Sequence, residues 1–117
     1  RFYIRLPESP DQVAGTVSLT SIVMGAFRSC FLGYKLDKDH LNRGLMTATV
    51  GLVTDYAFSQ LQLHRIEANV MHWNQASLRV VEKNGYQPEG LAREYLYING
   101  RWEDHLHMVK RNQALRL

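Results

Sequence analysis

The segment "HLNRGLMT" (40–47) combines features that suit a phosphate group. Gly44 stands immediately ahead of a helical apolar pattern, and Arg43 adds a positive charge. The first amides of a helix have no partners inside the helix and carry a partial positive charge, so together they favour a pyrophosphate. An ordinary strand-to-helix turn often contains the same glycine, so the pattern alone leaves both interpretations open.

A second candidate is Ser77, a small hydroxyl within the segment "WNQASLRVVEKNGYQPEG". Asn74 can cap the start of a short helix there, Gly85 can adopt the left-handed conformation that ends it, and Pro88 prevents its continuation. This places Ser77 in the first turn. Its hydroxyl could donate to a developing negative charge, or it could be a second cap or a solvated group.

A carboxylate–imidazole pair is the third candidate. Asn99-Gly100 is a strong signal for a two-residue hairpin turn, and the register that it predicts places Glu94 opposite His105. Such a pair could pass a proton to solvent, or it could be a cross-strand ion pair. The same register places Tyr97 opposite Trp102. These rings could pack on the sheet, line a substrate groove or stack on RNA bases.

The elements that must position these residues follow from periodicity and turn signals. We expect two helices, at roughly 45–60 and at 74–84, and strands at 1–6, 13–23, 29–36, 65–71, 91–98 and 101–109. In the first helix Met46, Val50, Val53 and Ala57 form one apolar stripe. Asp55 is the only charge there, so we expect this helix to be largely buried. The order β-β-β-α-β-α-β-β predicts a mixed α/β sheet, parallel across the long helix and antiparallel in the flanking hairpins.

Composition narrows the class of protein. The 117 residues predict one domain, 1–117, of ordinary hydrophobicity, with a net charge of +3 from scattered basic residues. No segment predicts a membrane span or a secretory leader, and the single Cys30 suits the cytoplasm as a packed strand residue rather than a nucleophile. The five histidines lack the spacing of a metal site, so we expect no metal. No basic run predicts direct nucleic-acid binding.

Five blocks of the chain resemble the GCN5-related N-acetyltransferase superfamily, and within it the ribosomal-protein (alanine/serine) N-terminal acetyltransferases of the Rim type. The blocks are "FLGYKL", "NRGLMT", "HRIEANVMHWNQAS", "VVEKNGYQPEG" and "AREYLYINGRWEDH". The resemblance runs over nearly the whole chain. It implies the acyl-CoA N-acyltransferase fold, and we expect residues 1–117 to be an N-terminally truncated domain that lacks the strand and two helices with which family members begin.

The resemblance also implies an acetyl-CoA site. The backbone of six consecutive residues would hold the pyrophosphate: Leu41, Asn42, Arg43, Gly44, Leu45 and Met46. Backbone groups near Leu36 and Asp37 would bind the pantetheine arm where two strands splay apart, and Asn74 would reach it from the other side. Leu41, Asn42 and Met46 depart from the family's usual loop pattern. Val81 stands where many members have a tyrosine that acts as the general acid for the leaving thiolate. Ser77 matches the serine thought to take that role in the Rim-type branch.

The implied reaction is direct attack of an amine on the thioester in a ternary complex. An α-amino group, with a pKa near 8, is neutral far more often at pH 7 than a lysine amine, so a protein N-terminus, for example that of a ribosomal protein, is the favoured acceptor. Glu94, paired with His105, is the candidate base, and Glu67 is the second choice. The alternatives are a small-amine acetyltransferase acting on a polyamine or antibiotic, and a non-catalytic acyl-CoA sensor or ribosome-associated adaptor. Ribosome association and a homodimer are further expectations from the resemblance.

Overall fold

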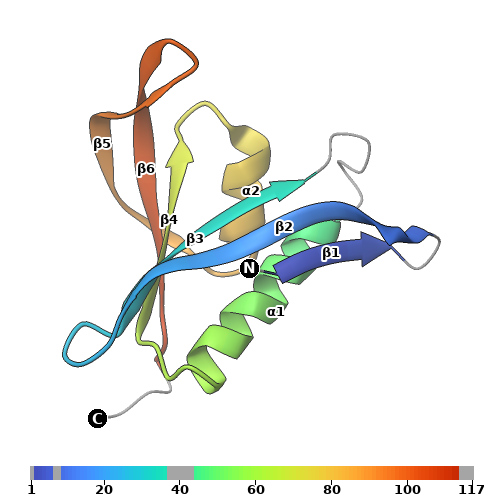
Figure 1. The fold of residues 1–117 in the computed structure, drawn as a ribbon. Helices are drawn as coiled ribbons and strands as arrows, with labels where there is room; N and C mark the ends of the chain where they lie inside the picture. The colour runs from blue at the N-terminus through green and yellow to red at the C-terminus, as the bar shows by residue number, and fades with distance from the viewer. Residues whose placement is uncertain (1, 7–8, 37–43, 114–117) are drawn as a thin grey trace.

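The computed structural model describes residues 2–6, 9–36 and 44–113. The predicted order β-β-β-α-β-α-β-β is confirmed (Figure 1). The strands are β1 (Phe2–Leu6), β2 (Ser9–Val23), β3 (Ser29–Leu36), β4 (Arg65–Met71), β5 (Gln87–Ile98) and β6 (Arg101–Arg111), and the helices are α1 (Leu45–Ser59) and α2 (Gln75–Lys83). Strands β2 and β5 each begin four residues earlier than their turn signals predicted. No helix in the described ranges is long and apolar enough to cross a bilayer.

The six strands form one mixed sheet in the order β1-β2-β3-β4-β6-β5. Every neighbouring pair is antiparallel except β3 and β4, which are parallel and are connected through α1. A parallel pair needs a long crossover, and the helix between the two strands supplies it. The predicted mixed sheet is therefore confirmed.

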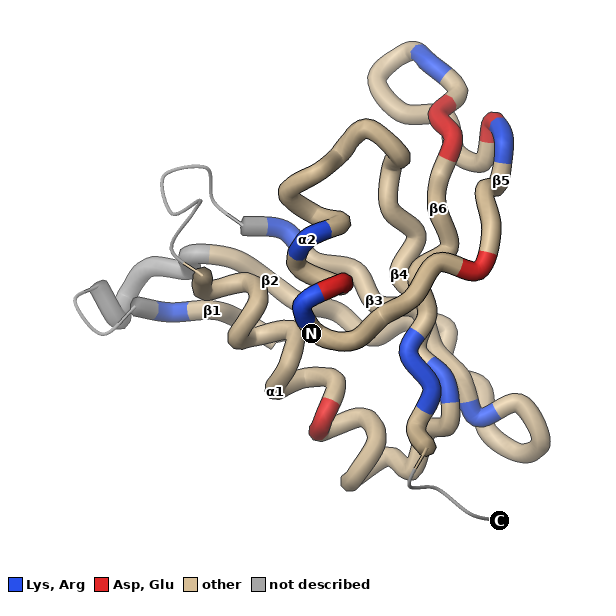
Figure 2. Tube along the Cα trace, turned by 180° about the vertical axis from the view of Figure 1, so that it is seen from behind, with Lys and Arg blue, Asp and Glu red and all other residues tan. Residues whose placement is uncertain are grey.

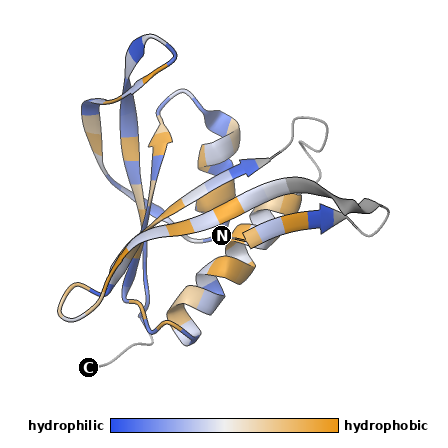
Figure 3. Ribbon diagram, viewed as in Figure 1, coloured by the Kyte–Doolittle hydropathy of each residue, from blue (hydrophilic) through white to orange (hydrophobic). Residues whose placement is uncertain are grey.

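Both helices pack on one face of the sheet and enclose the hydrophobic core. The predicted stripe of α1 is buried there, together with alternate residues of the strands and with Leu78 and Val81 of α2. Figure 3 shows apolar residues along α1 and along the strands near it. The expectation that α1 is largely buried is wrong, because Leu52 is 71% exposed, Tyr56 is 43% exposed and Asp55 is also on the surface. A helix that covers one face of a single sheet buries only the side that faces the strands.

Strands β3 and β4 separate part of the way along their length. They pair at Ser29–Arg65, Cys30–Ile66 and Phe31–Glu67, and the ladder stops there although β3 continues to Leu36 and β4 to Met71. Figure 1 shows the two strands diverging from this point. We call this divergence, between residues 32–36 and 68–71, the fork. Glu67 lies at its vertex.

The β5–β6 hairpin departs from the predicted register beyond its turn. The pairs Leu96–Glu103, Tyr97–Trp102 and Ile98–Arg101 follow the prediction, and the rings of Tyr97 and Trp102 lie 5.4 Å apart. An irregularity between residues 92 and 96 then shifts the ladder, so that Ala92 lies opposite His105.

The predicted pairing of Glu94 with His105 is therefore wrong. Glu94 sits inside the irregular segment with φ at 47°, and its backbone N–H donates to the Asp104 carboxylate at 2.8 Å. This local hydrogen bond stabilises the left-handed conformation. The irregular segment accommodates the extra residues that β5 has, relative to β6, between its two paired stretches. A two-residue turn fixes the register only next to itself.

Candidate functional site

A pocket of about 470 Å³ lies between Tyr34 of β3, the start of α1 and one side of α2, from its N-cap Asn74 to its last residue Lys83. It is lined by Tyr34, Gly44, Leu45, Met46, Thr47, Asn74, Ala76, Ser77, Arg79, Val80 and Lys83. The fold thus brings together the two segments that the sequence marked independently, the residues after Arg43 and the residues after Trp73. The pocket opens beside the fork, because Tyr34 belongs to the unpaired part of β3.

The start of α1, from its N-cap Gly44 to Thr47, lines this pocket. Gly44 is the N-cap with φ at 70°, and within the described residues no side chain caps it and no acidic residue occupies the first turn. A Cβ at Gly44 would meet nothing within 4 Å, so glycine is favoured here by the left-handed backbone rather than by lack of space.

Half of the predicted phosphate-binding loop lies within the described residues. Of the six residues predicted to hold a pyrophosphate, Gly44, Leu45 and Met46 line the pocket. Leu41, Asn42, Arg43 and the predicted pantetheine contact Asp37 lie outside the described residues. The backbone of Leu36 ends β3 on the unpaired side of the fork.

Asn74 is the N-cap of α2, as its position predicted. Its Oδ1 accepts the backbone N–H of Ser77 at 3.1 Å, which fixes the first turn and holds Ser77 in the pocket wall. At the other end of the helix, Gly85 has φ at 86°, as predicted from its type.

Replacing Asn74 with alanine should lower the free energy of unfolding by about 1 kcal/mol, because one helix amide loses its acceptor. The melting temperature should fall by about 4 °C in a domain of this size, measurable by circular dichroism. Gln75→Ala, at the exposed next position, is the matched control and should leave the melting temperature nearly unchanged. Equal effects of the two substitutions would contradict the capping role.

The hydroxyl of Ser77 lies 2.6 Å from the hydroxyl of Tyr34, and the Tyr34 hydroxyl also lies 3.0 Å from the Ser77 carbonyl oxygen. Burial raises the pKa of Tyr34 against the opposing effect of this hydrogen bond, so the phenol keeps its proton at neutral pH. Val81 is fully buried in the core and does not belong to the pocket lining. Ser77 is therefore the hydroxyl that α2 presents to the pocket.

Two cations in the lining were missed from the sequence. Arg79 and Lys83 lie one helical turn apart on α2 and line the pocket, and Figure 2 shows the basic residues of this helix. The described lining contains no acidic residue. Arg79 follows Ala76 by three residues and Lys83 follows Arg79 by four, a spacing that could have placed both on the same side of the helix as Ala76 in the first turn. The pocket therefore favours an anionic ligand.

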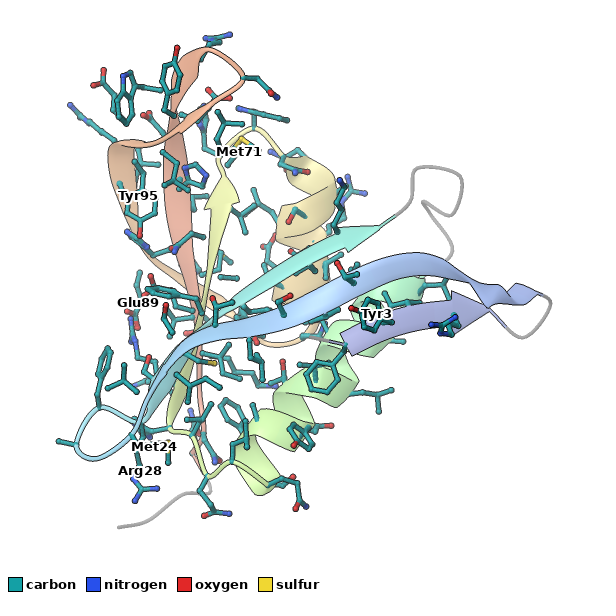
Figure 4. All side chains as sticks on the ribbon, in the orientation of Figure 1. Tyr3, Met24, Arg28, Met71, Glu89 and Tyr95 are labelled. Carbon is teal, nitrogen blue, oxygen red and sulfur yellow. The ribbon has the colours of Figure 1, made fainter. Side chains whose placement is uncertain are left out.

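The opposite face of the sheet carries a different cluster at the vertex of the fork. Glu67 accepts from Arg65 at 3.2 Å and lies 3.0 Å from Nδ1 of His107, which also contacts Asn69. Arg65 in turn bonds to both carboxylate oxygens of Glu89, at 2.7 and 3.1 Å, and this hydrogen bonding lowers the pKa of Glu89. Figure 4 shows Glu89 close to where β3 and β4 converge.

The carboxylate–imidazole pair thus exists, but between other residues than predicted. Glu67 and His107 are both half-buried and in contact. His105 is only 3% exposed, and its Nδ1 lies 3.0 Å from the Glu103 carbonyl oxygen, to which it must donate. A buried imidazole cannot hand a proton directly to solvent, so the structure gives no support to the predicted Glu94–His105 relay.

No metal centre is evident in the described ranges, where no three His, Cys, Asp or Glu side chains are grouped as ligands. The chemistry available to the site is hydrogen bonding to an anion, a hydroxyl donor inside the pocket, and a carboxylate on the other side of the fork.

Residues 1–87 match the family described as "Acetyltransferase (GNAT) domain". A probable N-acetyltransferase, YjcK, of Bacillus subtilis is 56% identical over 97 residues, which cover 83% of this chain and 54% of that protein. The chain therefore spans about half the length of the curated relatives it matches.

Solved structures agree with this match. Ribosomal-protein-S5-alanine acetyltransferase from Vibrio fischeri is 37% identical with a TM-score of 0.89, covering 91% of this chain and 58% of that one. Mycobacterium smegmatis RimJ in complex with CoA-disulfide is 33% identical with a TM-score of 0.87, covering 94% and 53%. A spermidine N-acetyltransferase SpeG chimera from Vibrio cholerae and hSSAT is 26% identical with a TM-score of 0.82, covering 93% and 64%. The chain belongs to the GNAT acetyltransferase family, which uses acetyl-CoA.

Proposed function

We propose that this protein transfers the acetyl group of acetyl-CoA to a primary amine by direct attack in a ternary complex. The observation that carries the proposal is the fork. A cationic pocket opens on the helix side of the sheet at the place where β3 and β4 part, and a carboxylate stands at the vertex. A thioester entering from the helix side would reach an amine on the other side through this gap.

The pocket residues suit the parts of acetyl-CoA. The uncapped amides at the start of α1 would bind the pyrophosphate, and Arg79 and Lys83 add positive charge for its phosphates. The outer half of β3 and the Asn74 end of α2 would flank the pantetheine arm. Ser77 would donate a hydrogen bond to the sulfur as negative charge develops there.

Glu67 is the candidate base in place of Glu94. It lies at the vertex of the fork, and Nδ1 of His107, which faces oxygens of both Glu67 and Asn69, donates to its carboxylate, so His107 would hold the carboxylate in place to take a proton from the acceptor nitrogen. The half-buried position leaves both groups within reach of water.

We infer that the acceptor is the N-terminal α-amine of a protein, such as a ribosomal protein. Two similar structures are named for ribosomal-protein acetylation or as RimJ, at identities of 37% and 33%. An α-amine, with a pKa near 8, also needs only a modest base. A small polyamine is the second candidate, because a spermidine N-acetyltransferase also has a similar structure.

The test is release of free CoA thiol from acetyl-CoA in the presence of alanine- or serine-initiated peptides, the same peptides with blocked N-termini, and spermidine. Thiol release with the free peptides, and not with the blocked ones, is the expected result. Faster release with spermidine would favour the polyamine acceptor. Binding of acetyl-CoA without thiol release from any acceptor would overturn the enzyme assignment in favour of a sensor or adaptor.

Cys30 should not interfere with this thiol assay. It is 2% exposed, and burial raises the pKa of its thiol to about 11, so little thiolate is present at neutral pH. We expect a chromogenic thiol reagent to label the native chain far more slowly than the chain in denaturant. Rapid labelling of the native chain would contradict the burial of Cys30.

A further inference from the structure

Tyr34 connects the fork to the helix that carries Ser77. It follows Cys30 and Leu32 on the helix-facing side of β3, and it lies three residues, about 10 Å, beyond the last β3–β4 pair. Its hydroxyl contacts both the Oγ and the carbonyl oxygen of Ser77. Tyr34 lies in the "FLGYKL" block, but no local pattern marked it as a site residue, because its contact with Ser77 joins positions 43 apart.

We infer that Tyr34 is a positioning residue that directs the hydroxyl hydrogen of Ser77 toward the CoA sulfur, an assignment that rests on the acetyltransferase function proposed above. The distances allow two arrangements of the two hydroxyl hydrogens. Tyr34 can donate to the Ser77 carbonyl while Ser77 donates to Tyr34. Alternatively, Tyr34 donates to Ser77 Oγ, and the hydrogen of Ser77 is then free for another acceptor.

Negative charge in the pocket selects the second arrangement. A thiolate beside Ser77 attracts the serine hydrogen. The Tyr34 O–H then turns from the Ser77 carbonyl to donate its hydrogen bond to Oγ, and the two hydrogen bonds strengthen each other. Without Tyr34, a helical serine often turns its hydroxyl to the carbonyl one turn back, which would remove the donor from the pocket. Tyr34 therefore keeps Ser77 available.

The chemical step balances without a proton leaving Tyr34. The acceptor nitrogen forms its bond to the thioester carbonyl carbon, the carbon–sulfur bond breaks, and the electron pair stays on sulfur. The proton lost by the nitrogen goes to the base, which releases it to solvent, and the thiolate takes a proton from solvent to become the free thiol. Tyr34 contributes one hydrogen bond to Ser77 throughout, and Ser77 contributes one to sulfur.

The test compares kcat and KM for acetyl-CoA in Tyr34→Phe, Ser77→Ala and the double variant, at a temperature where circular dichroism shows every variant folded. Tyr34→Phe should lower kcat about three- to thirtyfold and leave KM nearly unchanged, because it removes one hydrogen bond from a buried network. In the Ser77→Ala background the same substitution should have little further effect on kcat, since Tyr34 acts through Ser77.

Tyr86→Phe is the matched control. It deletes a buried tyrosine hydroxyl that bonds Thr54 at 2.8 Å, outside the pocket. It should lower the melting temperature without changing kcat. Equal losses of kcat in Tyr34→Phe and Tyr86→Phe would reduce the effect to general destabilisation and overturn the inference.

Other outcomes separate this inference from the proposed function. If Ser77→Ala slows the reaction and Tyr34→Phe does not, or if the two losses multiply in the double variant, the role of Tyr34 is wrong and the acetyltransferase proposal stands. If none of the tested acceptors causes the unsubstituted chain to release thiol, the proposed function fails and the inference fails with it.

Discussion

Replacing Ser77 with alanine is expected to lower kcat for acetyl transfer by about ten- to a thousandfold, the range for losing one acid or polar stabiliser. The Ser77 hydroxyl is the one that α2 places in the pocket, and Val81 supplies no second hydroxyl from this helix. KM for acetyl-CoA should change little, since the hydroxyl acts on charge that exists only as the thioester breaks. Initial rates of thiol release at saturating peptide measure both constants.

Ser59→Ala provides the control for this experiment. Ser59 is an exposed helical serine whose hydroxyl donates to the Asp55 carbonyl oxygen at 2.7 Å, at the far end of α1 from the pocket. Its kcat should match that of the unsubstituted chain. An unchanged kcat in Ser77→Ala would remove Ser77 from the mechanism, and a change confined to KM would make it a binding residue.

Glu67→Gln should produce the other large effect, a fall in kcat/KM for the acceptor of about a hundred- to ten-thousandfold. The amide keeps the size of the carboxylate and can still accept from Arg65, but it cannot take a proton from the acceptor nitrogen. The rates of both proteins should still rise as the pH approaches 8, because the neutral fraction of the α-amine increases. Thiol-release rates at low peptide concentration, from pH 6 to about 9, give this comparison.

Glu89→Gln tests whether the effect of Glu67 is only that of the ion-pair network. Glu89 bonds the same Arg65 guanidinium at 2.7 Å but lies on the exposed surface, and it is the Glu67 carboxylate that hydrogen-bonds His107. We expect its kcat/KM to stay within about threefold of the unsubstituted value, as for most exposed ion pairs. Comparable losses in the two variants would show that Arg65 placement, rather than a base at position 67, limits the reaction.

The elements of the fold were predictable because their signals are local. The apolar stripe of α1, the alternation in β4 and the Asn74 and Gly85 ends of α2 each depend on neighbouring residues, and the structure confirms them. The irregularity in β5 was not predictable, because it depends on a hydrogen bond between the Glu94 backbone and the Asp104 side chain across the hairpin.

The site divides in the same way. Gly44, Asn74 and Ser77 could be found from helix ends in the sequence, and the structure brings all three into one pocket. The contact between Glu67 and His107 requires knowing that β4 pairs with β6 rather than with β5. The contact of Tyr34 with Ser77 similarly depends on how far β3 extends past the last pair that it makes with β4.

The early end of the β3–β4 ladder leaves the sheet with an internal edge. Peptide groups beyond Phe31 and Glu67 that face this gap give up interstrand hydrogen bonds, each of which contributes about 0.5–1.5 kcal/mol in an intact sheet. A ligand that carries amide groups along an extended chain can form hydrogen bonds with these peptide groups, as a short extra strand would. The sheet should therefore become more rigid at the fork when such a ligand is bound, because β3 and β4 do not bond to each other there.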